Sequence, residues 1–352
     1  MRRLITVSTL AAALATLPAA SVLAQNAVTE VVGGLHSPRG LAIGPGGQLF
    51  VAQAGDATEA GSIIEVVNPM SRHPNVRTVV SGLPRVGDEG EFVGVDGISL
   101  LGNGVNGAIY GIMALSPQAT GNAAFGRLFR VNMRGETETL ANVGRVDFQW
   151  TADHSYLWQE FPDANPYGVL ATPGHIYVTD AGANTLDEVL PDGTVQVLAY
   201  FPNTTLRDAV PTCVTKGPDG MLYVGTLALV DNFVFGHAAT VYRVDPARTN
   251  PSDLSRVLSV ATPWATGLWP INGCTFGADG NFYASQLFTN PDFTDPQGDV
   301  VKIPFTSPAT HTFLTGGALA FPAGVAVGPN GTVFVADGAA FVPAGRVVRI
   351  TP

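Results

Sequence analysis

The chain is poor in lysine and in charge of either sign. Charged residues make up 13% of its 352 residues, and lysine occurs only as Lys216 and Lys302. Acidic residues outnumber basic ones by 28 to 18, so the formal net charge is −10. A protein that binds nucleic acid needs clustered basic residues to neutralise phosphates. The composition therefore excludes nucleic acid as a partner.

Long apolar runs are lacking beyond the N-terminus. The first 24 residues combine Arg2 and Arg3, an apolar stretch from Leu4 to Leu17 and a small-residue ending at Ala24. This pattern is typical of a secretory signal peptide, with cleavage after Ala24. No later run reaches the roughly 20 apolar residues that a membrane span needs. We expect residues 25–352 to be exported, to be periplasmic or extracellular, and to form a monomer with no membrane span.

Helical periodicity is lacking as well. We find no long stretch in which apolar residues recur every 3.6 positions. Glycine and proline are abundant instead, with 41 and 26 residues. This composition favours short strands joined by tight turns. It predicts an all-β protein.

What the chain does contain is a repeated phrase. Phe321–Asp337 reads as a short strand at residues 325–327, a turn at Gly328–Gly331 and a second strand at residues 332–336. Asn-Gly between apolar strands predicts a type I′ hairpin turn, in which both central residues have positive φ. Nearly the same phrase occupies Ser37–Gln53. Such recurrence indicates a repeat architecture.

Four further copies begin near residues 95, 166, 211 and 271. Third strands are predicted after the six copies at residues 62–67, 127–131, 185–190, 240–244, 299–303 and 346–350. Fourth strands are predicted at residues 77–80, 136–140, 194–199, 255–260 and 311–314. The last copy ends without one, and Val28–Val32 at the N-terminus supplies it. The sequence thus predicts one domain, residues 25–352, folded as a six-bladed β-propeller of four-stranded antiparallel blades whose ring is closed by the N-terminal strand.

Only two cysteines occur, Cys213 and Cys274. An even number in an exported protein suggests a disulfide. Both, however, fall in the first strand of their repeats, and they are offset by one position. A bridge needs Cα atoms within about 7 Å, and the innermost strands of neighbouring blades are expected to splay apart. We therefore expect two buried free thiols rather than a bridge.

The residue before the repeated glycine differs in every copy. First strands line the central channel of a propeller, so these residues should ring one mouth, where loops from all blades converge. The six rim positions are Arg39, Asp96, Tyr167, Thr212, Asn272 and Ala323. We expect a site at this mouth, with Arg39 and Tyr167 as ligand-binding residues.

Three oxygen-bearing side chains at or near the rim, Asp96, Asn165 and Asn272, suit a hard cation such as calcium. In the alternative interpretation, they hydrogen-bond the exposed ends of the first strands and water in the channel. His36 lies just before the first rim position and is a candidate catalytic base.

A long insertion, residues 145–165, interrupts the repeats after the second blade and is rich in aromatic residues. A connection of this length is typical of a lid or binding loop. Trp150, Trp158 and Asp163 are predicted to contact a small organic ligand. In the alternative, the aromatics only hold the insertion to the protein.

His154 is a second candidate base. Residues 229–237 and 287–298 are expected to be long hairpin loops.

Several segments together resemble the ScyD/ScyE family of exported proteins, which are named after components of the cyanobacterial scytonemin pathway. They are Ser37–Ala42 with Leu49–Ala52, Asp163–Gly168 and Gly236–Val244. The resemblance implies a six-bladed propeller in the periplasm or outside the cell. The ScyD/ScyE family belongs to a wider superfamily of propellers, which includes the NHL-repeat, gluconolactonase/regucalcin, paraoxonase and strictosidine-synthase types.

The gluconolactonase and paraoxonase types hold a calcium-like ion at the channel mouth with Glu, Asp and Asn. The matching residues here would be Asp96, Asn165 and Asn272. This chain departs from the pattern because Arg39 stands where those enzymes have a Glu. A cation beside Arg39 would be repelled.

Three functions remain open. The first is a ligand-binding or accessory role in a secondary-metabolite (scytonemin-like) or cell-envelope process, with the site at the channel mouth. The second is a calcium-dependent lactonase or esterase, and the third is a module that binds a protein or a glycan. A concave pocket over the channel would favour the first two, and an exposed apolar patch would favour the third. Fold alone does not decide among them.

Overall fold

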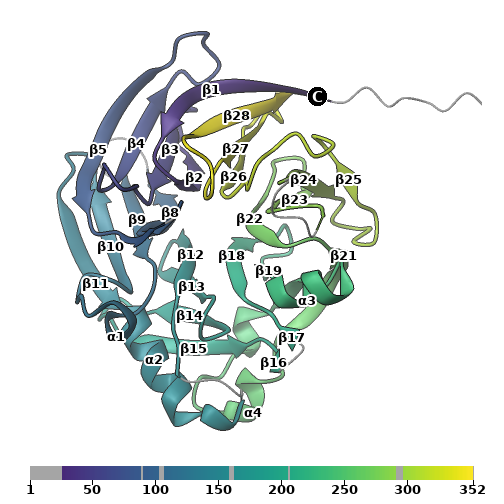
Figure 1. The fold of residues 1–352 in the computed structure, drawn as a ribbon. Coiled ribbons are helices and arrows are strands. Elements are labelled where there is room, and N and C mark those ends of the chain that lie inside the picture. The colour runs from purple at the N-terminus through teal and green to yellow at the C-terminus, as the bar shows by residue number, and fades with distance from the viewer. Residues whose placement is uncertain are drawn as a thin grey trace, which may run out of the picture.

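The computed structural model of the protein describes residues 26–88, 90–102, 107–157, 162–204, 207–290 and 296–351. Its strands form six four-stranded antiparallel sheets around a central channel (Figure 1). The predicted all-β, six-bladed propeller is therefore confirmed.

The blades follow one another in chain order. Blade one comprises β2 (Pro38–Ile43), β3 (Leu49–Gln53), β4 (Gly61–Val67) and β5 (Asn75–Leu83). Blade two comprises β8 (Val95–Leu101), β9 (Ala108–Met113), β10 (Arg127–Asn132) and β11 (Thr137–Asn142). Blade three comprises β12 (Pro166–Thr172), β13 (His175–Asp180), β14 (Thr185–Val189) and β15 (Val195–Tyr200). Blade four comprises β18 (Pro211–Lys216), β19 (Leu222–Thr226), β20 (Ala239–Val244) and β21 (Thr262–Leu268). Blade five comprises β22 (Ile271–Phe276), β23 (Phe282–Gln286), β24 (Asp299–Ile303) and β25 (Thr312–Phe313).

Blade six is built from both ends of the chain. Its first three strands are β26 (Val325–Val327), β27 (Val333–Asp337) and β28 (Gly345–Thr351), and the fourth is β1 (Ala27–Leu35). β1 pairs antiparallel with β28, from Ala27 opposite Thr351 to Leu35 opposite Gly345. The predicted closure by the N-terminal strand is therefore correct.

Apolar side chains between neighbouring blades form the core. Between blades one and two, for example, Phe50 and Ile63 pack with Ile109 and Phe129. All four are at least 95% buried. Burial of this kind on both faces of each sheet holds the ring together, at roughly 1.5–3 kcal/mol for each large apolar side chain.

The hairpin turn between β26 and β27 differs from the prediction. Only Gly331 has positive φ, at 82°, whereas Asn330 does not. The N–H of Gly331 donates to Gly328 O at 2.9 Å, and the N–H of Gly328 donates to Thr332 O at 2.8 Å. A type I′ turn needs two left-handed residues, so this turn is a different one that ends on a single left-handed glycine.

The insertion contains a helix that the sequence did not predict, α2 (Val143–Asp153). Asn142 caps it, because its side chain accepts a hydrogen bond from the N–H of Arg145 at 2.8 Å. Its buried positions include Asp147 and Thr151 beside Val143. The apolar period was missing from the sequence because this helix buries polar side chains.

Two further predictions are corrected in blade four. Residues 255–260 were expected to form the fourth strand, but they overlap the short helix α4 (Leu254–Val257), and the strand is β21. Asp253 caps α4 by accepting from the N–H of Ser255 at 3.1 Å, which favours a helix start over a strand. The expected loop at residues 229–237 is mostly the helix α3 (Leu229–Phe235).

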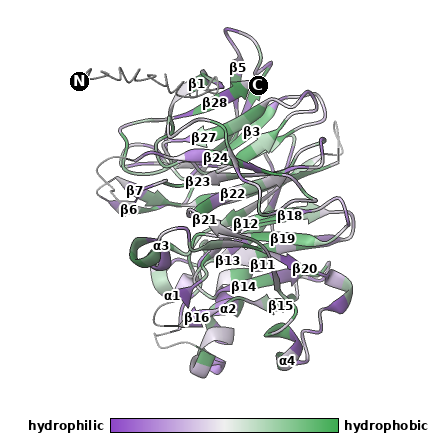
Figure 2. Cartoon of the chain, turned by 90° about the vertical axis from the view of Figure 1, so that its right-hand side faces the viewer, coloured by the Kyte–Doolittle hydropathy of each residue, from purple (hydrophilic) through white to green (hydrophobic). Residues whose placement is uncertain are grey.

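The remaining short elements lie outside the six four-stranded sheets. They are the hairpins β6 (Val86–Asp88) with β7 (Glu91–Val93) and β16 (Asn203–Thr204) with β17 (Arg207–Asp208), and the helices α1 (Pro117–Thr120), η2 (Ser155–Leu157) and η3 (Pro246–Arg248). Figure 2 shows β6, β7 and α3 on one face of the ring and α4 on the other. Within the described residues, no helix has the length and apolar character needed to cross a membrane.

Candidate functional site

The structure brings the six rim residues together at one mouth of the channel. Each stands at or near the start of the innermost strand of its blade. They line a cavity of about 70 Å³. The lining rim residues are Arg39, Asp96, Tyr167, Thr212, Asn272 and Ala323.

The position after the rim residue is glycine in five blades because neighbouring inner strands touch there. A Cβ at Gly97 would lie 2.4 Å from Tyr167 O, and a Cβ at Gly324 would lie 2.5 Å from Arg39 O. Real Cβ atoms essentially never approach this closely. The glycines thus allow close approach of strand to strand around the whole mouth. The glycines of the other three blades are Gly40, Gly168 and Gly273.

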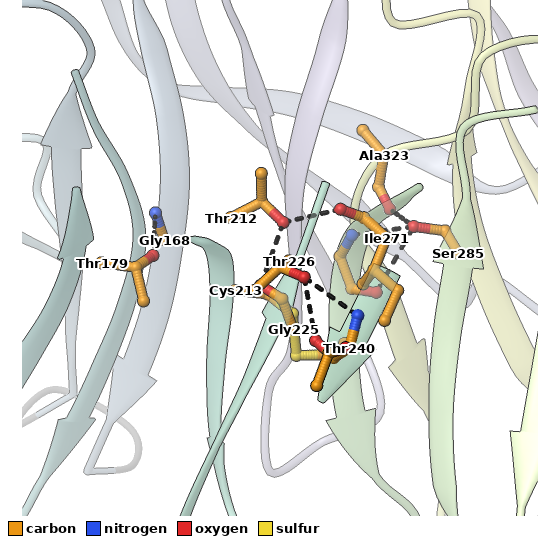
Figure 3. Close-up of a disulfide and its surroundings, with 12 residues drawn as sticks. Gly168, Thr179, Thr212, Cys213, Gly225, Thr226, Thr240, Ile271, Ser285 and Ala323 are labelled. Atoms are coloured by element: carbon orange, nitrogen blue, oxygen red, sulfur yellow. Dashed lines mark hydrogen bonds between the residues drawn. A yellow bond between two sulfur atoms is a disulfide. The ribbon is translucent and has the colours of Figure 1, made fainter. Parts of the chain in front are cut away.

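Blade four carries Cys213 at this position, and Cys213 forms a disulfide with Cys274 of blade five (Figure 3). The expectation of two free thiols is therefore wrong. Their Cα atoms are 5.7 Å apart, within bonding range, because the inner strands do not splay at this level. The offset of one position places Cys213 at the point of closest contact between the strands.

Hydroxyl groups also tie neighbouring blades to one another at the rim (Figure 3). Thr212 Oγ1 donates to Ile271 O of the next blade at 2.7 Å. Ser285 Oγ donates to Ala323 O across the following blade boundary. With the disulfide, these bonds hold the wall of blades four to six in one arrangement.

A chain of hydrogen bonds runs across the mouth. Arg39 Nη2 donates to Phe92 O at 2.6 Å, and Arg39 Nη1 donates to Tyr167 Oη at 3.4 Å. Tyr167 Oη donates to Asn272 Oδ1 at 2.6 Å, and Asn272 Nδ2 donates to Pro322 O at 3.1 Å. The chain joins blades one, three and five and orients each polar side chain.

Arg39 and Asp96 form a buried ion pair at the cavity. Arg39 Nε lies 3.9 Å from Asp96 Oδ1, and the two residues are 6% and 1% exposed. Burial raises the pKa of Asp96 to about 6, against the opposing effect of the Arg39 guanidinium. Arg39 Nε and Asp96 Oδ2 have no hydrogen-bond partner in the described part of the chain. At neutral pH the pair therefore offers one free donor and one free acceptor.

The predicted metal ligands are only partly brought together. Asp96 and Asn272 line the cavity, whereas Asn165 Oδ1 accepts from the N–H of Leu115 at 2.9 Å. Among the residues that the structure describes, no cluster of three or more His, Cys, Asp or Glu could hold a metal ion. A cation in the mouth would also sit beside the Arg39 guanidinium. The calcium site stays a prediction.

The aromatic insertion packs on the outer part of blade three. Trp150 stacks on His154 with ring centroids 4.5 Å apart and lies 5.8 Å from the ring of Tyr200 on β15. Trp150 also packs against the apolar cluster of Val197, Tyr200 and Val257. In Figure 1, α2 lies at the periphery of the ring, away from the channel. This arrangement agrees with the alternative in which the aromatics hold the insertion in place.

The other candidates from the insertion lie near its return to blade three. Thr151 Oγ1 of α2 donates to Asp163 O at 3.0 Å, and Asp163 Oδ1 accepts from the N–H of Ala164 at 2.8 Å. Trp158 lies outside the described residues. The ligand-binding roles of Trp150, Trp158 and Asp163 stay predictions.

His36 forms a separate pair with Asp56 on blade one. Its Nδ1 is 2.5 Å from Asp56 Oδ2, and its N–H donates to Gln53 Oε1 at 2.9 Å. A carboxylate at this distance orients an imidazole as it does beside a catalytic base. His36 is not among the residues that line the cavity, and its catalytic role stays a prediction.

Sequence reasoning missed two features, one at the mouth and one on the helix α3. One is Phe92 of β7, whose backbone carbonyl fixes Arg39; no side-chain pattern could reveal it because any residue carries that group. The other is an exposed apolar patch on α3, on the same face as β6 and β7 (Figure 2). Its residues are Val230, Phe233, Val234 and Phe235, which are 41–63% exposed.

Comparisons with known proteins give the fold alone. No family model and none of the curated proteins matches the chain. Solved structures do match over 93% of this chain. Virginiamycin B lyase from Staphylococcus aureus has a TM-score of 0.54 at 14% identity over 99% of its own chain. A putative oxidoreductase (glucose dehydrogenase) from Thermus thermophilus has a TM-score of 0.56 at 15% identity over 100% of its own chain. Luciferin-regenerating enzyme has a TM-score of 0.55 at 14% identity over 95% of its own chain. The chain thus shares the propeller fold of several enzymes.

Proposed function

We propose that the protein binds a small organic ligand at the channel mouth and that the Arg39–Asp96 pair takes the polar end of that ligand. In this proposal it is an exported propeller, as its resemblance to the ScyD/ScyE family suggests. It then has a ligand-binding or accessory role in a secondary-metabolite or cell-envelope process.

The observation that carries the proposal is the pair of unpartnered atoms beside the cavity. Arg39 Nε and Asp96 Oδ2 are buried, yet neither has a hydrogen-bond partner among the described residues. Leaving a charged buried group unsatisfied costs at least about 1–3 kcal/mol. A ligand that accepts from Arg39 and donates to Asp96 would recover that free energy.

The size and chemistry of the mouth limit what can enter. A cavity of about 70 Å³ is well below the roughly 300–1,000 Å³ of sites that enclose a whole organic ligand. Only a group of a few atoms fits at the rim itself. The rest of the ligand lies over the mouth or in the adjoining cavity of about 290 Å³, which shares Leu41, Val169 and Val325 with the rim cavity. A primary amide or a hydroxyl group combines an acceptor with a donor at neutral pH, which matches the free atoms of the pair.

Ligand-observed NMR at pH 7 with acetamide and ethanol tests the proposal, followed by a series of aryl amides and alcohols. We expect binding to the wild-type protein and at least a tenfold loss in Arg39→Met, because a charge-assisted hydrogen bond contributes about 1.5–3 kcal/mol. Arg130→Met is the matched control, since Arg130 pairs with Glu138 at an exposed site. Equal binding by both variants, or none by the wild type, would refute the proposal.

Isothermal titration calorimetry with calcium chloride addresses the lactonase alternative. We expect no calcium binding while Arg39 is present, because the ion would have to displace the guanidinium from Asp96. Calcium binding that Asp96→Ala abolishes would instead favour the hydrolase. The α3 patch is the feature that favours an interaction module, and it is not part of the cavity on which this proposal depends.

A further inference from the structure

Three carboxyl groups meet inside the protein beneath α2. Asp180 and Asp187 lie on the paired strands β13 and β14, and Asp147 extends from α2 toward them. All three are 0% exposed. The Asp147 carboxyl lies within hydrogen-bonding reach of both others. The insertion is therefore joined to blade three through a carboxyl cluster.

Among the described residues, donors satisfy only two of the six carboxyl oxygens in this cluster. Asp180 Oδ1 accepts from the N–H groups of Asn165, Gly182 and Ala183 at 2.7, 3.0 and 2.8 Å. On the neighbouring strand, a threonine hydroxyl donates to the other carboxylate, from Thr185 Oγ1 to Asp187 Oδ2, at 2.9 Å. The remaining oxygens have no donor among the described residues: Asp180 Oδ2, Asp187 Oδ1 and both oxygens of Asp147.

Within the part of the chain that the structure describes, no basic side chain balances the cluster. α2 packs against α1, β10, β13 and β15. The charged and titratable groups on these elements are Arg127, Arg130, His175, Tyr177, Asp180 and Tyr200. Arg130 pairs with exposed Glu138, His175 pairs with Glu188, and Tyr200 Oη donates to Leu157 O. Asp187 and Asp180 are the charged groups that act most strongly on Asp147.

Carboxyl groups that are buried within hydrogen-bonding reach of one another cannot all be ionised. Since no described cluster suits a metal ion, protons are the remaining way to relieve the repulsion. A protonated carboxyl also supplies the donor that the unpartnered oxygens lack.

We propose that Asp147 is a neutral carboxylic acid that shares its proton with Asp180 or Asp187, and that this shared proton latches α2 onto blade three. Loss of the proton leaves repelling carboxylates at the joint and releases α2. The latch does not depend on the ligand proposed above.

The direction of its pH dependence follows from the environment. Burial, then the charges of Asp187 and Asp180, raise the pKa of Asp147 well above 3.8. Burial raises the pKa of Asp180 to about 6, although the N–H groups of Ala183 and Asn165 oppose the rise. The folded state therefore binds protons more tightly than the unfolded state. The stabilisation that the shared proton provides is therefore complete below about pH 4, and it weakens as the pH rises through 6 and above.

The joint lies close to the channel mouth along the chain. Asp180 holds the backbone of Asn165, which precedes Tyr167 of the rim by two residues. Release of α2 would loosen the segment that leads into Tyr167. The latch thus links pH to the order of one wall of the mouth.

Hydrogen exchange of the mature protein from pH 5 to pH 8, corrected for intrinsic rates, tests the latch. We expect protection of the α2 amides to fall by up to about tenfold per pH unit for each proton released. Amides of β27, across the ring, serve as an internal reference and should keep their protection. In Asp147→Asn the side-chain amide replaces the acid as donor, so α2 should stay protected at all pH values. Asp153→Asn, at the exposed end of α2, should behave as the wild type.

Three outcomes would overturn the latch. They are constant α2 protection in the wild type, unchanged pH dependence in Asp147→Asn, and calcium-dependent protection of the wild type that Asp147→Asn removes. The last would show that a cation holds the cluster. If Asp147→Asn does not fold, the wild-type series and Asp187→Asn decide the question.

Discussion

At the scale of single residues, the mouth depends on side chains that satisfy one another across the channel. Tyr167 is central because its hydroxyl accepts from Arg39 and donates to Asn272. Asn272 is 5% exposed, so water cannot readily replace a lost donor. The polar character of the mouth is therefore part of the stability of the fold.

Replacing Tyr167 by Phe should lower the free energy of unfolding by about 1–3 kcal/mol, because Asn272 Oδ1 would be left buried without a donor. Urea denaturation at pH 7 measures the change. Tyr156→Phe is the control, since Tyr156 is 70% exposed and should change stability by less than about 0.5 kcal/mol. Equal midpoints for the two variants would contradict the importance of this hydrogen bond.

At the scale of elements, the ring depends on close contact between inner strands. The glycine that follows the rim residue in five of the six blades permits that contact. Between blades six and one, the N–H of Gly324 donates to Arg39 O at 2.9 Å. The helix α2 is held differently, because it combines the apolar contacts of Trp150 with buried polar side chains, Asp147 and Thr151.

A methyl group at Gly97 should force blades two and three apart. Its Cβ would lie 2.4 Å from Tyr167 O and 2.9 Å from Ile112 Cγ2. Gly97→Ala should therefore cost about 1–3 kcal/mol of unfolding free energy, as overpacking usually does.

Thermal and urea unfolding can measure this effect against Gly44→Ala. A Cβ at Gly44 meets only the flexible side chain of Gln48, so that substitution should cost much less. Similar losses in both variants would show that strand contact is not what selects glycine at Gly97.

At the scale of the whole molecule, the ring is closed by β1 and reinforced by one covalent bond. Cys213 and Cys274 are 61 residues apart and join the inner strands of blades four and five. A bond that closes a loop of this length restricts the unfolded chain strongly.

The double variant Cys213→Ser, Cys274→Ser should lose about 2–4 kcal/mol of unfolding free energy. Denaturation with and without reductant provides the test. Reductant should bring the wild type toward the double variant and leave the double variant unchanged. A wild type that is insensitive to reductant and equal to the variant would mean that the bridge does not form.

Much of this architecture is readable from local sequence. Strand alternation, turn glycines and the repeated phrase are short-range features, so they predicted the six blades, the closing strand and the rim positions of Arg39, Asp96, Tyr167 and Asn272. The signal peptide, calcium and the ligand roles of the insertion remain predictions.

Tertiary structure decided the rest, because it depends on distances between segments that are remote in sequence. The approach of inner strands determined that Cys213 and Cys274 pair. The carbonyl of Phe92 determined where Arg39 points, and the meeting of Asp147 with Asp180 and Asp187 determined how the insertion is held. Local sequence sets the period of a strand, whereas the spacing between blades sets which side chains meet.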